Sequence, residues 1–262
     1  MGIFANPLTD LLEYEDFSRD FLKGTDPVGM TGCIDSEKVH FMSTFLGEKK
    51  VQLVVTYNEQ RAREIEEDYK LFCSQVYVIP PRDLIFFSAD LQGNAIIAER
   101  MKAFAALYQN EAKVIITTMD ALMSAAVPFE QLMSHVIKLK EGDELDLEKL
   151  KHDLTVMGYE RVGRVEEPGQ FTVHGGIADV YPLTMEVPVR IELWGDEIDT
   201  IRCFEPQSQR SMDQIECVSV FPAAEVIADD TARRRAVGMI QNELESQLAV
   251  FKKAKEPDKA KR

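Results

Sequence analysis

The chain has 262 residues, of which 45% are hydrophobic, so it is long enough to form one large or two moderate domains around a true core. Its formal net charge of −15 disfavours a surface that grips nucleic acid along its whole length. The cysteines show no C-x-x-C spacing, which disfavours a zinc site, and scattered cysteines are typical of a reducing compartment such as the cytoplasm. They are Cys33, Cys73, Cys203 and Cys217. We find no signal peptide and no apolar run of the ~20 residues that span a bilayer, so we expect a cytoplasmic protein without membrane contact.

The first half of the chain alternates predicted helices with apolar strands. Helices are predicted at 7–22, 34–46, 59–72, 94–108 and 119–125. Continuous apolar runs of strand length occur at 51–56, 76–79 and 113–117. A further short strand is predicted at 28–32, ahead of a glycine turn. Apolar strands that alternate with helices are typical of a parallel α/β sheet with helices on both faces, and we predict this fold class here.

The pattern changes after Pro128, where short strands begin to follow one another directly. A short helix and a strand are predicted within 129–140, helices at 146–157 and about 230–252, and strands at 169–174, 177–182, 188–194, 197–204 and 214–221. The run Trp194-Gly195-Asp196-Glu197 has the composition of a tight hairpin turn. The second part is therefore predicted to be an antiparallel α+β module, and the basic tail 252–262 a solvated terminus.

A loop near the start of the chain has partial similarity to the phosphate-binding pattern G-x-x-x-x-G-K-[ST]. Gly29, Gly32 and Ser36 fit the first glycine, a permissive position and the hydroxyl that binds Mg²⁺. Ile34 and Asp35 stand where the second glycine and the lysine are required. An aspartate adds negative charge where phosphates must be neutralised, so we expect a degenerate loop that binds no ATP. The loop residues are Gly29, Thr31, Gly32, Ile34, Asp35 and Ser36.

Residues 158–182 contain the best candidate for a contact surface. From Phe171 onward, apolar and polar side chains alternate as in a half-buried strand. Phe171 is therefore expected to face a core, and Thr172 and His174 to face outward. Gly175 then begins a glycine turn that permits backbone angles closed to other residues. A polar row beside a fixed turn is well placed to contact a partner.

This stretch belongs to a longer pattern that resembles a known family. The pattern comprises Tyr159-Glu160-Arg161, Gly169, Phe171, Gly175, Asp179, Tyr181-Pro182, and Arg190-Ile191-Glu192 through Gly195-Asp196-Glu197-Ile198. Through it, residues 158–224 closely resemble the N-terminal region of the bacterial transcription-repair coupling factors, the Mfd family, and more distantly the excision-repair protein UvrB. The degenerate loop favours the Mfd family, as does the stretch 80–95, which is too short for the long hairpin of UvrB.

The resemblance implies the domain organisation of UvrB. A degenerate P-loop-like α/β domain would comprise 1–122 and 209–262, with an antiparallel α+β domain inserted at 123–208. In this family the inserted domain binds UvrA and so recruits nucleotide excision repair to a stalled RNA polymerase. The fragment itself is expected to be non-catalytic, without cofactor or metal. ATP, Mg²⁺, DNA and RNA polymerase would act only through other domains of a full-length ATP-dependent translocase, whose remainder is expected to mask the UvrA surface.

The resemblance also implies the contact residues. In UvrB the positions that contact UvrA are an arginine after Tyr-Glu and two arginines that flank a valine before the glycine turn. Arg161 matches the first, whereas Thr172 and His174 stand at the other two. The predicted UvrA-binding edge is Arg161, Arg164, Phe171, Thr172, His174 and Gly175.

Alternatives stay open for single residues and for the whole chain. Arg161 could instead form a surface ion pair, and His174 could simply pack on the turn. Trp194 falls on the outward side by alternation and is either a cover over its hairpin or a binding residue. The chain could also be an ATP-dependent DNA helicase core, or a DNA-binding module that uses 252–262 or 61–70.

Overall fold

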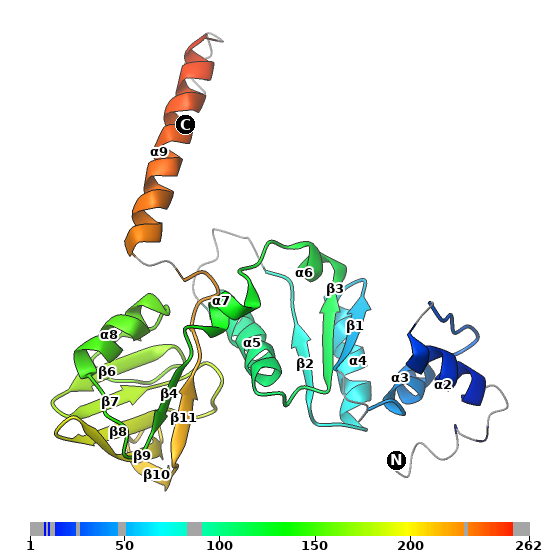
Figure 1. Cartoon of the computed structure of the whole chain (residues 1–262), viewed down its shortest axis with the longest axis horizontal. Coiled ribbons are helices and arrows are strands. Elements are labelled where there is room, and N and C mark those ends of the chain that lie inside the picture. Colours follow the sequence, from blue (N-terminus) through cyan, green and yellow to red (C-terminus); the bar gives the residue numbers. More distant parts are fainter. Residues whose placement is uncertain are drawn as a thin grey trace.

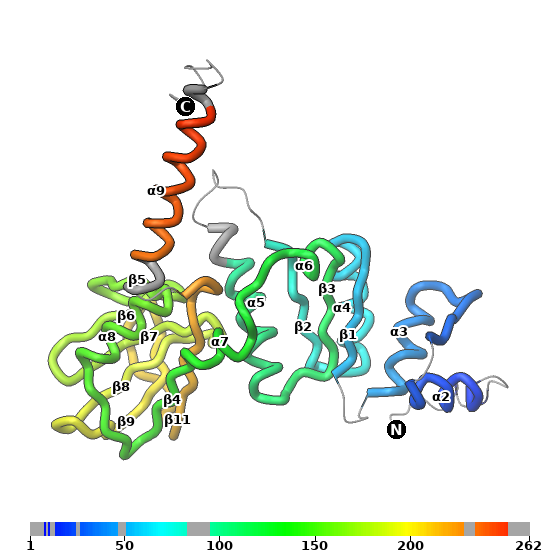
Figure 2. Tube along the Cα trace, turned by 45° about the horizontal axis from the view of Figure 1, so that its top comes forward, coloured from blue at the N-terminus to red at the C-terminus, as the bar shows by residue number. Residues whose placement is uncertain are grey.

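The structure is a computed structural model of the chain. It describes residues 8, 10, 14–24, 27–46, 51–82, 91–227 and 230–253, and only the backbone at 91–94, 230–233 and 251–253. Two parts that each contain a β-sheet lie side by side, with helices α2 (Tyr14–Lys23) and α3 (Asp35–Ser43) beyond the first part (Figure 1). Helix α9 (Asp230–Lys253) extends away from both parts, as a second view also shows (Figure 2).

The first part is built on a three-stranded parallel sheet, which confirms the prediction. In spatial order its strands are β1 (Gln52–Thr56), β3 (Val114–Thr118) and β2 (Val76–Ile79). The helices that accompany it are α4 (Glu59–Lys70), α5 (Leu91–Tyr108), α6 (Met119–Met123) and α7 (Phe129–Met133). Tyr69 of α4 packs on one face of β3 beside Val114, and Ala103 of α5 packs on the other beside Ile115. The core of this part therefore lies on both faces of the central strand.

The predicted strand at 28–32 is absent from the structure, so this prediction was wrong. These residues connect α2 to α3 without joining a sheet, and Val28 is exposed. Gly32 has φ +83°, a conformation outside any strand, and glycine weakens strands in general. The expected helix at 7–22 is observed from Tyr14 onward. Most of its first turns and most of the predicted tail 252–262 lie outside the described residues, as do residues 83–90 of the stretch 80–95.

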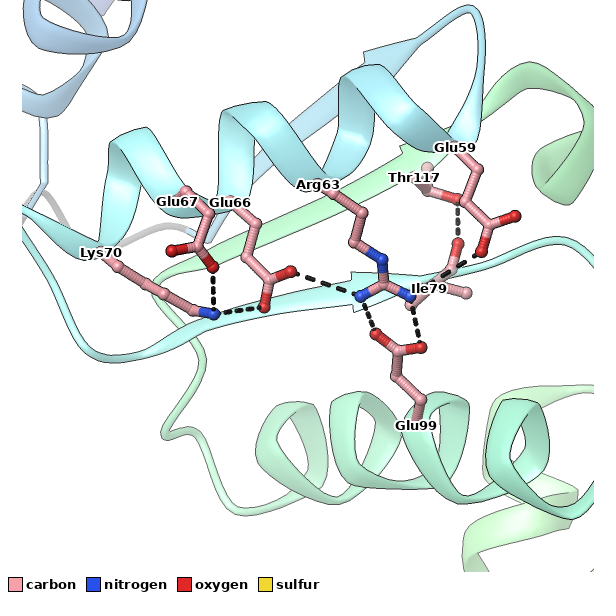
Figure 3. Close-up of polar contacts among 8 residues, drawn as sticks. All are labelled: Glu59, Arg63, Glu66, Glu67, Lys70, Ile79, Glu99 and Thr117. Atoms are coloured by element: carbon pink, nitrogen blue, oxygen red, sulfur yellow. Dashed lines mark hydrogen bonds and ion pairs between the residues drawn. The ribbon is translucent and has the colours of Figure 1, made fainter. Parts of the chain in front are cut away.

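The two edges of the parallel sheet differ in their surroundings. Arg63 of α4 extends past β2 and forms a bidentate ion pair with Glu99 of α5 (Figure 3). Arg63 Nη2 lies 2.6 Å from Glu99 Oε2. Glu66 adds a third carboxylate oxygen 3.3 Å from Arg63 Nη1. At the opposite edge, Leu53 and Val55 of β1 are exposed and line a recess of about 930 Å³. Charged side chains thus cover the β2 edge, while in the described part of the chain the β1 edge borders an apolar recess that α2 and α3 also line.

The second part is built on a six-stranded sheet with two further strands and a helix. In spatial order the sheet contains β10 (Ser211–Gln214), β9 (Glu197–Phe204), β8 (Val189–Trp194), β7 (Ile177–Val180), β6 (Gln170–His174) and β5 (Glu160–Arg161). All neighbours are antiparallel except β5 and β6, which are parallel. The remaining elements are β4 (Ile137–Lys140), its antiparallel partner β11 (Cys217–Val220), and helix α8 (Leu147–Val156). The antiparallel α+β class is confirmed, and the short strands β5 and β10 are additions to the prediction.

The chain returns from the second part to the first through residues 221–225. Phe221 packs against Met101 of α5, and the Tyr159 hydroxyl donates to the Phe221 carbonyl at 2.7 Å. Glu225 then accepts hydrogen bonds from Arg82 and Arg100. Strands β10 and β11 pair with β9 and β4 of the second part, so the return begins after these strands rather than at residue 209.

Candidate contact edge of the antiparallel sheet

The hairpin of β6 and β7 is closed by a two-residue glycine turn, as predicted. His174 pairs with Ile177 across the turn. Gly175 has φ +60°, a left-handed conformation that favours glycine. The φ of Gly176 is not positive. A positive φ at the first turn residue alone is the pattern of a type II′ turn, whose twist suits a tight hairpin. The turn is exposed, so this end of the sheet is accessible.

Side chains along β6 alternate between two differently packed sides of the sheet. Phe171 and Val173 face the main core, where they pack with α8 and strands β7 to β9. The Phe171 side chain is 0% exposed. Including Phe171 among the partner contacts was therefore wrong. A fully buried ring cannot touch a partner and can only support the edge strand by packing in the core.

Thr172 lies on the opposite side of the sheet, yet it too is buried, at 7% exposure. The prediction that it faces solvent was wrong because a second layer covers this half of the sheet. Val165, Tyr181 and Phe204 form a small apolar cluster over it. The Thr172 hydroxyl lies 3.0 Å from His174 Nδ1, so it positions the imidazole rather than contacting a partner.

A partly buried ion pair lies against this second layer. Arg190 Nε and Nη2 donate to the two carboxylate oxygens of Asp179 at 2.7 and 2.8 Å. The guanidinium lies over the Phe204 ring, 4.7 Å from its centroid, and also reaches Gln209. Hydrogen bonding to Asp179 raises the pKa of Arg190, so the guanidinium keeps its charge. Sequence reasoning missed this pair, although both residues stand in the pattern shared with the Mfd family.

Arg161 lies on β5, the edge strand of the sheet, and is exposed. Its backbone pairs in parallel with Phe171, so the two side chains leave the sheet on the same side, away from His174. Within the described residues its guanidinium has no carboxylate partner, which leaves the alternative of a surface ion pair without support. Arg161 is therefore an exposed cation at the sheet edge, separate from the His174 turn and unpaired among the residues that the structure describes.

Arg164, by contrast, is already occupied. Its Nη2 donates to the carbonyls of Pro206 and Gln207, and its Nε lies 3.3 Å from the Glu166 carboxylate. These bonds tie the loop after β5 to the loop after β9. Of the predicted contact residues, Arg161, Arg164, His174 and Gly175 are exposed, but the Arg164 guanidinium is already bonded to these two loops.

The degenerate loop shows how Asp35 is neutralised. Lys38 Nζ donates to Asp35 Oδ1 at 3.0 Å, and Arg61 Nη2 lies 3.4 Å from Oδ2. The hydrogen bond from Lys38 and the charge of Arg61 hold the pKa of Asp35 below its usual range. The Glu37 carboxylate accepts the Ile34 N–H at 3.0 Å. Two carboxylates thus stand at the start of α3, where a phosphate-binding loop would present donors.

The other loop positions, Gly29, Thr31, Gly32 and Ser36, are exposed. Among the described residues, no three His, Cys, Asp or Glu side chains come together as a metal site. In the same part of the chain, no helix is both long and apolar enough to cross a bilayer.

Comparison with known proteins shows which family one part of the chain matches and which longer proteins the chain is similar to. Residues 137–225, which contain the antiparallel sheet, match the family described as the UvrB interaction domain. The transcription-repair-coupling factor of Staphylococcus haemolyticus is 34% identical over 231 residues, which make up 87% of this chain. The chain is homologous to the N-terminal part of transcription-repair-coupling factors. The factor of Bacillus subtilis is 29% identical over 259 residues, or 97% of this chain.

The transcription-repair-coupling factors are much longer than this chain, which spans 19% of the Staphylococcus haemolyticus protein and 22% of the Bacillus subtilis protein. The matched UvrB interaction domain begins at β4 and ends at Glu225, the residue that contacts Arg82 and Arg100. The domain therefore coincides with the second part plus its return to the first.

Proposed function

We propose that this chain is a non-catalytic docking module that binds UvrA and, within a longer transcription-repair-coupling factor, brings excision repair to a stalled RNA polymerase. The observation that carries this proposal is the match of residues 137–225 to the UvrB interaction domain. Arg161 on the edge strand supports it, because its guanidinium has no carboxylate partner in the described part of the chain and could bind a partner carboxylate through two parallel hydrogen bonds.

The edge strand also suits docking for geometric reasons. Strand β5 is two residues long and pairs with β6 beside the fully buried Phe171. The backbone that carries Arg161 is therefore held in the sheet. The His174 turn lies at the end of the neighbouring strand, about three residues or ~10 Å along the sheet. UvrA would therefore contact two separate points, the edge at Arg161 and the turn at His174.

We expect Arg161→Ala to weaken UvrA binding by about 2 kcal/mol, roughly 30-fold, if Arg161 is a binding hot spot. The loss follows because the partner carboxylate would be desolvated without its cation. Isothermal titration calorimetry with purified cognate UvrA measures it. Arg210→Ala removes another exposed arginine, in the turn between β9 and β10, and serves as the matched control. Unchanged affinity for both Arg161→Ala and His174→Ala would remove the assigned surface.

We further propose that the module binds no nucleotide at the degenerate loop. Asp35 and Glu37 place two carboxylates where phosphates would bind, and Lys38 and Arg61 are already paired with Asp35. Titration with Mg²⁺ and ATP is expected to give no heat of binding and no turnover, with or without DNA. Micromolar ATP binding that Asp35→Ala abolishes would contradict this proposal.

A further inference from the structure

The only tryptophan of the chain, Trp194, is almost completely exposed, at 84%. It ends strand β8 and pairs with Glu197 across the Gly195-Asp196 turn. A tryptophan that covered its hairpin would be largely buried, so this alternative is excluded. Large aromatic side chains left in water are costly, and tryptophan is enriched among the residues that dominate protein interfaces.

Trp194 shares one side and one end of the sheet with the His174 turn. Ile177, the first residue of β7, pairs with Glu192, two residues before Trp194. The Leu193 N–H donates to the Gly176 carbonyl at 2.8 Å, so the two hairpin turns are joined. Leu193 packs toward the main core, which directs Trp194 to the opposite side.

This end of the sheet is the uncovered half of a side that is otherwise packed. The apolar cluster of Val165, Tyr181 and Phe204 covers the half that contains Thr172 and Asp179. Beyond it, His174 is exposed, Ile177 is 40% exposed, and Trp194 stands free. We name these three residues the tryptophan surface.

The tryptophan surface is held by backbone bonds rather than by a loose loop tip. The Leu145 N–H donates to the Asp196 carbonyl at 2.8 Å and anchors the β8–β9 turn to the segment before α8. Gly195 has φ +66°, which fits a tight turn. A side chain presented from an anchored turn loses little backbone freedom on binding, and such preorganisation strengthens an interface.

The charges around Trp194 indicate the chemistry of its partner. Asp196 and Glu197 are exposed beside it, and Glu192 lies on the same side of the sheet. Within the described residues none of these carboxylates forms an ion pair with a cation. A complementary surface would therefore offer an apolar recess for the indole with basic groups around it.

We propose that the tryptophan surface is a second anchor for UvrA, in which Trp194 enters an apolar recess with a basic rim. This inference rests on the proposed function, and it follows from the continuity of Trp194 with the His174 turn. The contact area of UvrA would then extend across the end of the sheet, from the turn of β6 and β7 to that of β8 and β9. Arg161 would contribute at the edge, and Trp194 at this end.

The test compares UvrA binding by calorimetry for the wild-type chain and its variants. Trp194→Ala is expected to weaken binding by about tenfold to a hundredfold, and Ile177→Thr by less. Tyr57→Ala, at another exposed aromatic residue far from this sheet, is the matched control and should bind as the wild type does. Because Trp194 is exposed, its replacement leaves the fold intact, which circular dichroism checks.

A second readout uses the single tryptophan. A chain labelled with 5-fluorotryptophan has one ¹⁹F signal, and adding unlabelled UvrA should shift or broaden it and protect it from a paramagnetic quencher. If Arg161→Ala weakens binding while Trp194→Ala does not, and the ¹⁹F signal is unchanged by UvrA, this inference is overturned and the proposed function stands. If the wild-type chain does not bind UvrA at all, both fall.

Discussion

Glu225→Gln is expected to lower the free energy of unfolding by about 3–5 kcal/mol, the usual cost of breaking a buried ion pair by removing one partner. Glu225 is 7% exposed and Arg100 3% exposed. Arg82 Nε lies 2.9 Å from Glu225 Oε2, and Arg100 contacts both carboxylate oxygens. Glutamine keeps the size of the side chain but removes the one carboxylate that pairs with both guanidinium groups among the described residues. Urea unfolding measures the change.

An exposed ion pair of the same chain provides the control for Glu225. Lys102 Nζ lies 2.7 Å from Glu186 Oε1, and the Glu186 side chain is almost fully exposed. Glu186→Gln should therefore change the stability by only about 0–1 kcal/mol. If both variants fell in that range, the buried cluster would contribute no more than a surface pair, contrary to our expectation.

The same cluster predicts a pH dependence. Burial by itself raises the pKa of Glu225, but hydrogen bonds from Arg100 and Arg82 outweigh it and leave the pKa lowered. A carboxylate whose pKa is lower in the folded state than in the unfolded state stabilises the fold. Its contribution is complete above the unfolded pKa of about 4.3 and is lost as the pH falls toward the folded pKa. The wild type should therefore lose its stability advantage over Glu225→Gln below about pH 4.3. An advantage that grew with acidification would have the wrong sign.

Phe171→Ala is expected to cost about 3–5 kcal/mol of stability, the range for removing a buried aromatic ring from a core. The ring is fully buried behind the edge strand that carries Arg161. Met212→Ala, at an exposed apolar residue of β10, should change the stability by less than about 0.5 kcal/mol. Chemical denaturation measures both.

The milder variant Phe171→Leu separates support from contact. It keeps most of the apolar volume, so the folded chain should bind UvrA with an affinity within a few-fold of the wild type. A tenfold loss of affinity in a variant that remains as stable as the wild type would show that Phe171 itself takes part in binding.

The sequence predicted elements well where local chemistry decides them. The helix predicted at 59–72 forms and is capped by Asn58, which accepts the Arg61 N–H at 2.8 Å, and the apolar runs form the three parallel strands. The prediction of a strand at 28–32 failed because strand formation depends on pairing with a neighbouring strand. Pairing is a non-local property that the apolar residues and glycines of this segment do not determine.

The candidate site was predictable in part for the same reason. Alternation placed Thr172 and His174 on one side of β6, which the register confirms. Whether that side is exposed depends on Val165 and on Phe204 near the end of β9, far from β6 in sequence. The separation of Arg161 from His174 likewise depends on the parallel pairing of β5 with β6. No local sequence pattern predicts that pairing.

The unequal edges of the parallel sheet limit how this chain can self-associate. Within the described residues strand β1 pairs only with β3, and its apolar side chains border a recess, whereas the Arg63–Glu99 pair lies across β2 (Figure 3). Edge-to-edge joining through this sheet could therefore link two molecules by their β1 strands and would stop there, because each partner then has only its charged edge left. Fibril growth needs two free edges on every molecule, so this sheet terminates a stack rather than extending it.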